Sequence, residues 1–190
     1  EECQRGNIAS ENEKIITHIS NLRPVKRASD VIEIFYKIQK TIPSKLLLVG
    51  EGPDRELIEF KVKELGILDK VLFLGNSDEV NKLLCYSDLF LLPSETESFG
   101  LAALEAMAAK TPVISTNSGG LPEVNIQGVT GFLSNVGDSD DMAKNGIHIL
   151  ENNTRLQEFK VNAFKQAEKF SMKNILPAYN EMYNELMETY

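Results

Sequence analysis

The chain has 190 residues, a length that fits one globular domain, because domains usually span about 100–200 residues. Hydrophobic residues make up 42% and charged residues 25% of the sequence. These values exclude a disordered tail, a collagen-like repeat and a miniprotein held by disulfides. The 20 basic and 28 acidic residues leave a net charge of −8, which argues against a broad binding surface for nucleic acid or an anionic membrane.

The two cysteines, Cys3 and Cys85, are too few for a disulfide framework or a metal-ligand cluster, so we expect free thiols in a reducing compartment. No apolar run approaches the ~20 residues of a membrane span, and the first residues lack the apolar region of a signal peptide. We therefore expect a cytoplasmic protein. The polar start without an initiator methionine indicates a piece of a longer protein, with residues 1–14 as an N-terminal segment or linker.

Five short apolar runs alternate with longer helical stretches in the first two thirds of the chain. Because these runs have no polar alternation, each predicts a strand buried on both faces, and the stretches between them are long enough for crossover helices. We therefore expect an α/β fold over residues 15–170, a Rossmann-like parallel sheet with helices on both faces. The predicted strands are Ile15–Ile19, Leu46–Val49, Val71–Leu74, Leu89–Leu92 and Val113–Ser115, and the predicted helices between them are about 28–41, 53–65, 78–86 and 99–110.

The last third of the chain has the pattern of helices, with Asp138 and Ser139 as candidate caps of the first one. The final segment, residues 171–190, spaces its apolar residues three and four apart. One face of this helix therefore needs a surface to pack on, inside the chain or outside it. The predicted helices are at roughly 138–150, 153–169 and 173–188.

In open parallel sheets ligands bind beyond the carboxyl ends of the strands, so the loops at that edge carry the candidate site. The most unusual of them is the polar loop 94–98, which leads directly into an almost wholly apolar helix. Gly100 allows close approach of the backbone, and the free amides from Phe99 to Ala102 form a ready anion site. Glu105 is the only charge in that helix, so its carboxylate must meet a cation, ligand hydroxyls or water. A structural ion pair or a solvent-facing position is the plainer alternative.

The loop after the first strand gathers three cations, Arg23, Lys26 and Arg27, in an otherwise acidic chain. Arg and Lys side chains can neutralise a diphosphate, although a solvated loop would have the same composition. The paired glycines of the loop Ser118–Glu123 suit a backbone close to a ligand or to a neighbouring loop. We expect His18, inside the first strand, to be a packed residue near the site.

Glu97 and Glu105, with seven residues between them that begin Ser98-Phe99-Gly100-Leu101, resemble the E-x7-E signature of the retaining family-four glycosyltransferases of GT-B fold. The resemblance runs from about Lys14 to the end of the chain. It implies the C-terminal, nucleotide-sugar-binding half of a two-domain enzyme, whose final helix crosses back to an N-terminal domain absent from this chain. The segments that resemble the family in the expected order are Leu48-Val49-Gly50-Glu51-Gly52-Pro53, Val71-Leu72-Phe73-Leu74-Gly75, Ser87-Asp88-Leu89-Phe90-Leu91-Leu92-Pro93-Ser94, Pro112-Val113-Ile114 and Gly119-Gly120-Leu121-Pro122-Glu123.

The commoner pattern of that family has Gly-Arg where this chain has Ser20-Asn21. With Pro24-Val25-Lys26-Arg27 following, this variant resembles the family's N-acetylglucosaminyl L-malate synthases, which begin bacillithiol assembly by transferring GlcNAc from UDP-GlcNAc to malate. The implied partners are a UDP-sugar, a small acceptor and the absent domain, with a homo-oligomer left open. The alternatives are another sugar donor or acceptor, such as a glycan or lipid, or a noncatalytic nucleotide-sugar-binding scaffold.

The resemblance also implies roles for individual residues. Glu105 would hold the ribose hydroxyls and Glu97 the hydroxyls of the transferred sugar, while Lys26 would stabilise charge on the departing UDP. Arg23 would help, and whether it replaces the family arginine stays open. No cofactor and no metal are expected, and one wall of the site is absent, so we expect this chain to bind donor but transfer no sugar. The residues expected to bind the donor are Ser20, Asn21, Asn76 near the uracil, Ser98, Phe99, the amides of Gly100, Leu101 and Ala102, and Glu105.

Overall fold

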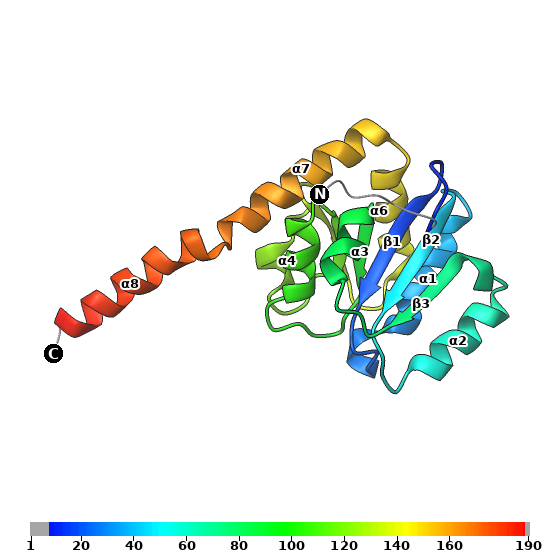
Figure 1. The fold of residues 1–190 in the computed structure, drawn as a ribbon, viewed down its shortest axis with the longest axis horizontal. Coiled ribbons are helices and arrows are strands. Elements are labelled where there is room, and N and C mark those ends of the chain that lie inside the picture. The colour runs from blue at the N-terminus through cyan, green and yellow to red at the C-terminus, as the bar shows by residue number, and fades with distance from the viewer. Residues whose placement is uncertain (1–7, 189–190) are drawn as a thin grey trace.

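The centre of the protein is a six-stranded sheet in which all strands run parallel (Figure 1). The computed structural model describes residues 8–188. The strand order is β3-β2-β1-β4-β5-β6, so the expected Rossmann-like sheet is confirmed. The strands are β1 (Lys14–Ile19), β2 (Ser44–Val49), β3 (Val71–Gly75), β4 (Leu89–Leu92), β5 (Val113–Thr116) and β6 (Gly131–Ser134).

The strand order reverses between β1 and β4, which pair in parallel through Ile16 with Leu89 and Thr17 with Phe90. On its other side β1 pairs with β2 along its whole length. At such a reversal the connections from the two strands leave towards opposite faces, which opens a crevice at the carboxyl end of the sheet. The loops that follow β1 and β4 are therefore the natural walls of a binding site.

Helices cover both faces of the sheet and bury its apolar strands (Figure 1). One core cluster packs α1, α2 and α6 against one face, and a second packs α3, α4 and α5 against the other. α7 contributes to both, through Leu156 and Phe159 to the first and through Ala163 and Ala167 to the second. The helices are α1 (Ala28–Gln39), α2 (Arg55–Glu64), α3 (Val80–Tyr86), α4 (Leu101–Ala108), α5 (Leu121–Val124), α6 (Ser139–Leu150), α7 (Asn153–Lys169) and α8 (Met172–Glu188).

All five predicted strands form, and the predicted helices agree with the structure to within two residues at each end. Asp138 is the cap of α6, since its carboxylate accepts a hydrogen bond from the Asp141 amide over 3.0 Å. Among the strands and α-helices, two were not predicted, the single-turn α5 and the edge strand β6. β6 begins at Gly131, where a Cβ would lie 1.8 Å from the Val113 carbonyl oxygen, and glycine is a weak signal for a strand.

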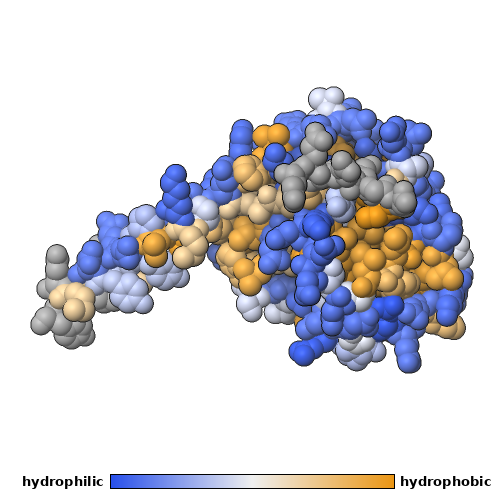
Figure 2. All heavy atoms as spheres, viewed as in Figure 1, coloured by the Kyte–Doolittle hydropathy of each residue, from blue (hydrophilic) through white to orange (hydrophobic). Residues whose placement is uncertain are grey.

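α8 extends away from the rest of the molecule (Figure 1). Its first turn is tied to the end of α7, where Asn174 Nδ2 donates to the Glu168 carbonyl over 2.7 Å. Farther along, Leu176, Tyr179 and Tyr183 are exposed, and Figure 2 shows apolar side chains along this projecting helix. The described part of the chain thus leaves the apolar face of α8 uncovered. None of the helices described between residues 8 and 188 is long and apolar enough to cross a membrane.

Cys85 lies half-buried in the last turn of α3 and is disulfide-bonded. The expected free thiol is therefore wrong for this residue, and Cys3 lies outside the described residues. The spacing of cysteines along the chain carried no such signal, because a disulfide depends on how the fold places two Cα and Cβ atoms.

Candidate functional site

Two loops meet at the reversal of the strand order, residues 20–27 after β1 and residues 93–100 after β4. The Glu95 amide donates to the Val25 carbonyl over 2.8 Å, which ties one loop to the other. A pocket of about 270 Å³ opens beside them. The residues that line it are Ile19, Lys26, Glu97, Ser98, Phe99, Gly100, Leu101 and Ala102.

An ion pair spans the two loops at the pocket. Lys26 Nζ lies 2.5 Å from Glu97 Oε1, and the Ser94 hydroxyl donates to the same carboxylate oxygen over 3.0 Å. The Lys26 and Glu97 side chains keep 23% and 14% of their surface exposed, so they are shielded from most water and yet reach the pocket. The arrangement can present an ammonium group to a phosphate and a carboxylate to sugar hydroxyls.

α4 begins at the pocket wall without a side-chain cap. Its N-cap is Gly100, which has a left-handed backbone with φ of 91°, and the Gly100 carbonyl accepts from the Leu104 amide over 3.0 Å. The first amides of a helix have no carbonyl partner within it, so those of Leu101 and Ala102 remain hydrogen-bond donors at the pocket. Because the helix dipole adds partial positive charge at this end, the start of α4 can receive an anionic oxygen.

The paired glycines after β5 pack against a neighbouring loop, which is one of the two alternatives that the sequence left open. A Cβ on Gly119 would lie 1.9 Å from the Glu97 carbonyl oxygen, and the Gly120 amide donates to that oxygen over 2.9 Å. The Ser118 hydroxyl donates to the Glu95 carbonyl over 2.7 Å. These contacts hold the backbone at Glu97, whose carboxylate pairs with Lys26.

A second pair of glycines supports the loop after β1. A Cβ on Gly50 would lie 1.8 Å from the Ser20 carbonyl oxygen, and one on Gly52 would lie 2.0 Å from that of Asn21. The next residue, Leu22, is fully buried with φ of 39°, a left-handed conformation that is strained for a branched side chain. Such strain persists only where the surroundings hold it, and it is common at functional sites.

His18 holds the same loop through a chain of hydrogen bonds. Its Nδ1 lies 2.8 Å from the Leu91 carbonyl oxygen, which can only accept, so Nδ1 carries the proton and donates. Nε2 then accepts from the Ser20 hydroxyl over 2.8 Å, and the Leu22 amide donates to that hydroxyl over 3.2 Å. Burial and, to a smaller extent, the positive charge of Lys26 lower the pKa of His18 to about 4, against the raising effects of the Leu91 hydrogen bond and of Glu97. His18 is therefore a packed neutral residue beside the site, as predicted.

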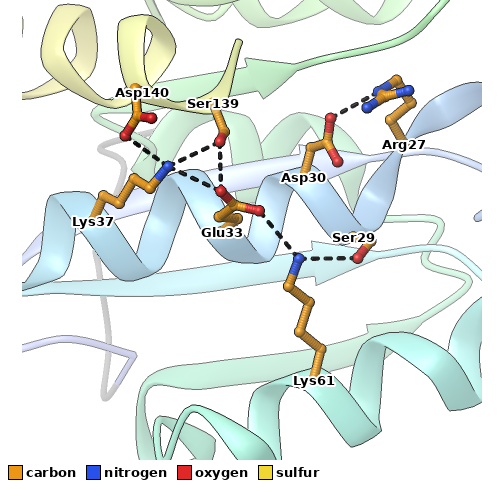
Figure 3. Close-up of polar contacts among 8 residues, drawn as sticks. All are labelled: Arg27, Ser29, Asp30, Glu33, Lys37, Lys61, Ser139 and Asp140. Atoms are coloured by element: carbon orange, nitrogen blue, oxygen red, sulfur yellow. Dashed lines mark hydrogen bonds and ion pairs between the residues drawn. The ribbon is translucent and has the colours of Figure 1, made fainter. Parts of the chain in front are cut away.

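The structure separates the three cations of this loop. Lys26 lines the pocket. Arg27 Nε donates to Asp30 Oδ2 over 2.7 Å, so its guanidinium is turned towards α1 (Figure 3). Arg23 is exposed and has no ion pair with any other residue between 8 and 188. Of the three cations, Lys26 thus lies at the pocket, and Arg23 has a side chain that no ion pair within the described residues holds.

Other predicted residues lie at the same end of the sheet but outside the pocket lining. Asn21 and Glu105 are exposed, and Asn76 is exposed beyond β3, two strands from β1 and thus about 10 Å along the sheet. Glu105 forms no ion pair within the described range, so the structural ion pair is excluded, and its exposed carboxylate is open to water or to ligand hydroxyls. Ile19 lines the pocket and was not predicted, because an apolar residue at a strand end carries no chemical signal.

A second charged cluster joins α1 to α2 and α6 (Figure 3). Glu33 Oε1 accepts from the Ser139 hydroxyl over 2.7 Å and from Lys37 Nζ over 2.9 Å, and its Oε2 lies 3.4 Å from Lys61 Nζ. Lys37 also pairs with Asp140 over 2.8 Å. The hydrogen bonds from Ser139 and Lys37 lower the pKa of Glu33 to about 2. Nothing in the sequence distinguishes this cluster, because Lys and Glu residues are common on protein surfaces.

Among the residues that the structure describes, no group of three or more His, Cys, Asp or Glu side chains is placed to hold a metal ion. Metal-independent neutralisation of a diphosphate stays a prediction. Lys26 and the amides at the start of α4 are the groups that the pocket offers for it.

Comparison with known families matches residues 1–166 to the family described as Glycosyl transferases group 1. N-acetyl-alpha-D-glucosaminyl L-malate synthase of Bacillus anthracis is 46% identical to this chain over 179 residues. The alignment covers 94% of this chain and 47% of that protein. The chain therefore spans about half the length of the curated relatives that it matches first.

Solved structures share the fold. A mutant of TarM from S. aureus, in complex with fondaparinux, alpha-GlcNAc-glycerol and UDP, aligns with a TM-score of 0.83 and 27% identity, over 91% of this chain and 36% of that one. Alr3699/HepE from Anabaena, in complex with UDP and glucose, aligns with a TM-score of 0.82 and 26% identity, over 94% of this chain and 49% of that one. These neighbours are GT-B glycosyltransferases, in agreement with the expected fold class.

Proposed function

The chain belongs to the group 1 family of glycosyl transferases, and we propose that it is the donor-binding half of a retaining enzyme that transfers GlcNAc from UDP-GlcNAc to L-malate. The relative from Bacillus anthracis supports the choice of donor and acceptor through its name and its 46% identity. The UDP in the TarM and HepE complexes supports a uridine nucleotide.

One observation carries the proposal: the Lys26–Glu97 pair and the uncapped start of α4 line one pocket at the reversal of the strand order. A diphosphate is an anion with two groups of oxygens, and it needs both a mobile cation and fixed amide donors. The sugar next to it needs a hydrogen-bond acceptor for its hydroxyls. The pocket holds all three kinds of group within two adjoining loops.

The proposed chemistry assigns a task to each group. The bond between the sugar C1 and the diphosphate oxygen breaks, the acceptor hydroxyl oxygen bonds to C1, and the proton of that hydroxyl passes to the departing diphosphate oxygen. Negative charge grows on the departing diphosphate, where the Lys26 ammonium and the amides of Leu101 and Ala102 offset it. Glu97 accepts hydrogen bonds from the sugar hydroxyls, and Glu105 accepts from the ribose.

Donor binding requires an exchange of partners at Lys26. Its ammonium contacts Glu97 Oε1 in the structure. A diphosphate seated at the start of α4 would take over that ammonium and leave the Glu97 carboxylate for the sugar hydroxyls.

Calorimetry with this chain tests the donor. We expect UDP and UDP-GlcNAc to bind more tightly than the ADP and GDP counterparts. Equal binding of all the nucleotides, or tighter binding of an adenine nucleotide, would defeat the uridine assignment. No response to any of them would favour a scaffold that has kept the fold without the chemistry.

Transfer is tested by an assay with UDP-GlcNAc and L-malate. We expect no product from this chain alone and GlcNAc-malate after the separately produced N-terminal half is added, because aligning the acceptor needs the second wall of the cleft. Robust product from the chain alone would show that the acceptor site lies within these residues. The same assay should include a panel of other acceptors, namely small hydroxy acids, glycans and lipids. If one of them gives product and malate does not, that acceptor replaces malate in the proposal.

A further inference from the structure

The aromatic wall of the pocket is supported from behind by a residue at the end of α7. Phe99 lines the pocket, and its ring meets that of Phe170 edge to face, with centroids 5.7 Å apart and planes 72° apart. Both side chains are half-buried and pack against the second core cluster. Aromatic pairs in this geometry contribute stabilisation beyond the area that they bury. Phe170 itself is not part of the pocket lining.

α7 lies antiparallel to α4, and two aromatic side chains, Phe164 in α7 and Phe170 at its end, contact residues at opposite ends of α4. The Phe164 ring lies 5.5 Å from Lys110 Nζ, just beyond the C-terminal end of α4. Six residues later, Phe170 reaches Phe99, just before the N-terminal end of α4. Ala167, which lies between these two contacts in the chain, is buried in the second core cluster. The ring of Phe170 is therefore a contact of α7 with the pocket loop, whereas Phe164 contacts the far end of the same helix.

Phe99 directly precedes the backbone that opens α4. Gly100 comes next, with its left-handed φ of 91°, and after it the amides of Leu101 and Ala102 open towards the pocket. We propose that Phe170 is a positioning residue for this pocket, whose ring holds Phe99 so that Glu97 and the first amides of α4 face the same space. The inference deepens the proposed function and rests on it for the ligand, a uridine nucleotide. A misplacement of about 1 Å in such a site is enough to weaken its action.

The first test compares UDP binding by three variants of this chain. Phe170→Leu keeps an apolar side chain but removes the ring, and Phe164→Leu makes the same change on the same helix away from the pocket. We expect Phe170→Leu to weaken UDP binding by about 3- to 10-fold in calorimetry, the range for losing one aromatic pair. Phe164→Leu should leave the affinity unchanged, and Phe170→Tyr should restore it because the ring is kept.

The second test needs no ligand. Hydrogen exchange of the amides of residues 97–102 should become about 3- to 10-fold faster in Phe170→Leu than in Phe164→Leu, because local opening of the loop becomes easier. Equal exchange in this segment, together with equal UDP affinity of the two leucine variants, would overturn the inference. If the parent chain binds no uridine nucleotide but Phe170→Leu still speeds exchange in this segment, the proposed function fails while the positioning role of Phe170 is supported.

Discussion

Two clusters in this protein, around Glu33 and around Glu97, both pair Glu with Lys side chains but differ in their surroundings. Glu33 lies between α1, α2 and α6, and both of its carboxylate oxygens have partners (Figure 3). Glu97 lies in the loop after β4 and faces the loop after β1, and within residues 8–188 only its Oε1 is hydrogen-bonded, to Lys26 and Ser94. The first cluster joins three regular helices, whereas the second borders an open pocket.

The difference is the one that we expect between an ion pair that stabilises the fold and an ion pair that binds a ligand. A carboxylate whose oxygens are all satisfied gains nothing from a ligand and contributes to stability. A carboxylate with an unused oxygen, beside a cation and uncapped amides, keeps capacity for a ligand. The strained backbone at Leu22 lies in the second region, which fits a site that is held in place by its surroundings. We therefore expect changes in the Glu33 cluster to act on stability and changes in the Lys26 cluster to act on binding and turnover.

The largest effect should come from Lys26→Ala in the full-length enzyme. Turnover should fall by about 100-fold, because the ammonium gains most as charge grows on the departing diphosphate. Lys37→Ala, the matched change in the other cluster, should leave turnover unchanged and lower the free energy of unfolding by about 1 kcal/mol. Steady-state kinetics with UDP-GlcNAc and denaturant unfolding measure the two effects. An unchanged turnover number with only a raised donor KM in Lys26→Ala would contradict the assignment.

The second prediction concerns His18 and the loss of folding stability at acid pH. The pKa of His18 is lowered to about 4 in the folded protein, so between pH 6.5 and 4 the unfolded chain binds the proton first and stability falls as the pH falls. We expect a loss of about 3 kcal/mol from pH 7 to pH 4 in denaturant titrations. His18→Gln should remove this slope, whereas His148→Gln, an exposed position on α6, should keep it. Equal slopes in the two variants would show that His18 is not the group responsible.

Glu105→Gln tests the exposed carboxylate of α4. It should weaken UDP binding by about 2 kcal/mol, the loss of a charged hydrogen-bond partner, and leave the free energy of unfolding unchanged. Glu158→Gln, at an exposed position on α7, is the matched control and should change neither quantity. A fall in stability with unchanged UDP affinity would mean that the carboxylate serves the fold and not the ribose.

The smallest effect is expected from Glu33→Gln. Its side chain is 41% exposed, so solvent screening limits the loss in the free energy of unfolding at pH 7 to about 1 kcal/mol. Because the pKa of Glu33 is lowered to about 2, this contribution is present above pH 4.5 and disappears as the pH falls towards 2. The difference between parent and variant should shrink over that range in denaturant titrations, with UDP affinity unchanged at pH 7. A weakened UDP affinity in Glu33→Gln would show that the Glu33 cluster also affects ligand binding, and would contradict its assignment to stability alone.

The local features of the fold could be predicted from the sequence because they depend on neighbouring residues. Apolar runs without alternation identified five strands, and helical spacing located the helices to within two residues. The start of α4 could be predicted in the same way, since the polar loop, Gly100 and the apolar stretch follow one another in the chain. β6 was missed because its glycine and its four residues resemble a turn until β5 is beside it.

The tertiary structure alone decided which distant residues meet. Lys26 and Glu97 are 71 positions apart, and they form a pair because the strand order brings β1 beside β4. The same packing placed Phe170 against Phe99 and gave Glu33 its partners from two other helices. Composition and spacing determined the kinds of element and the kinds of group, because secondary structure and side-chain chemistry are local properties. The positions of those groups relative to one another followed only from burial of the sheet between two layers of helices, which no short stretch of sequence contains.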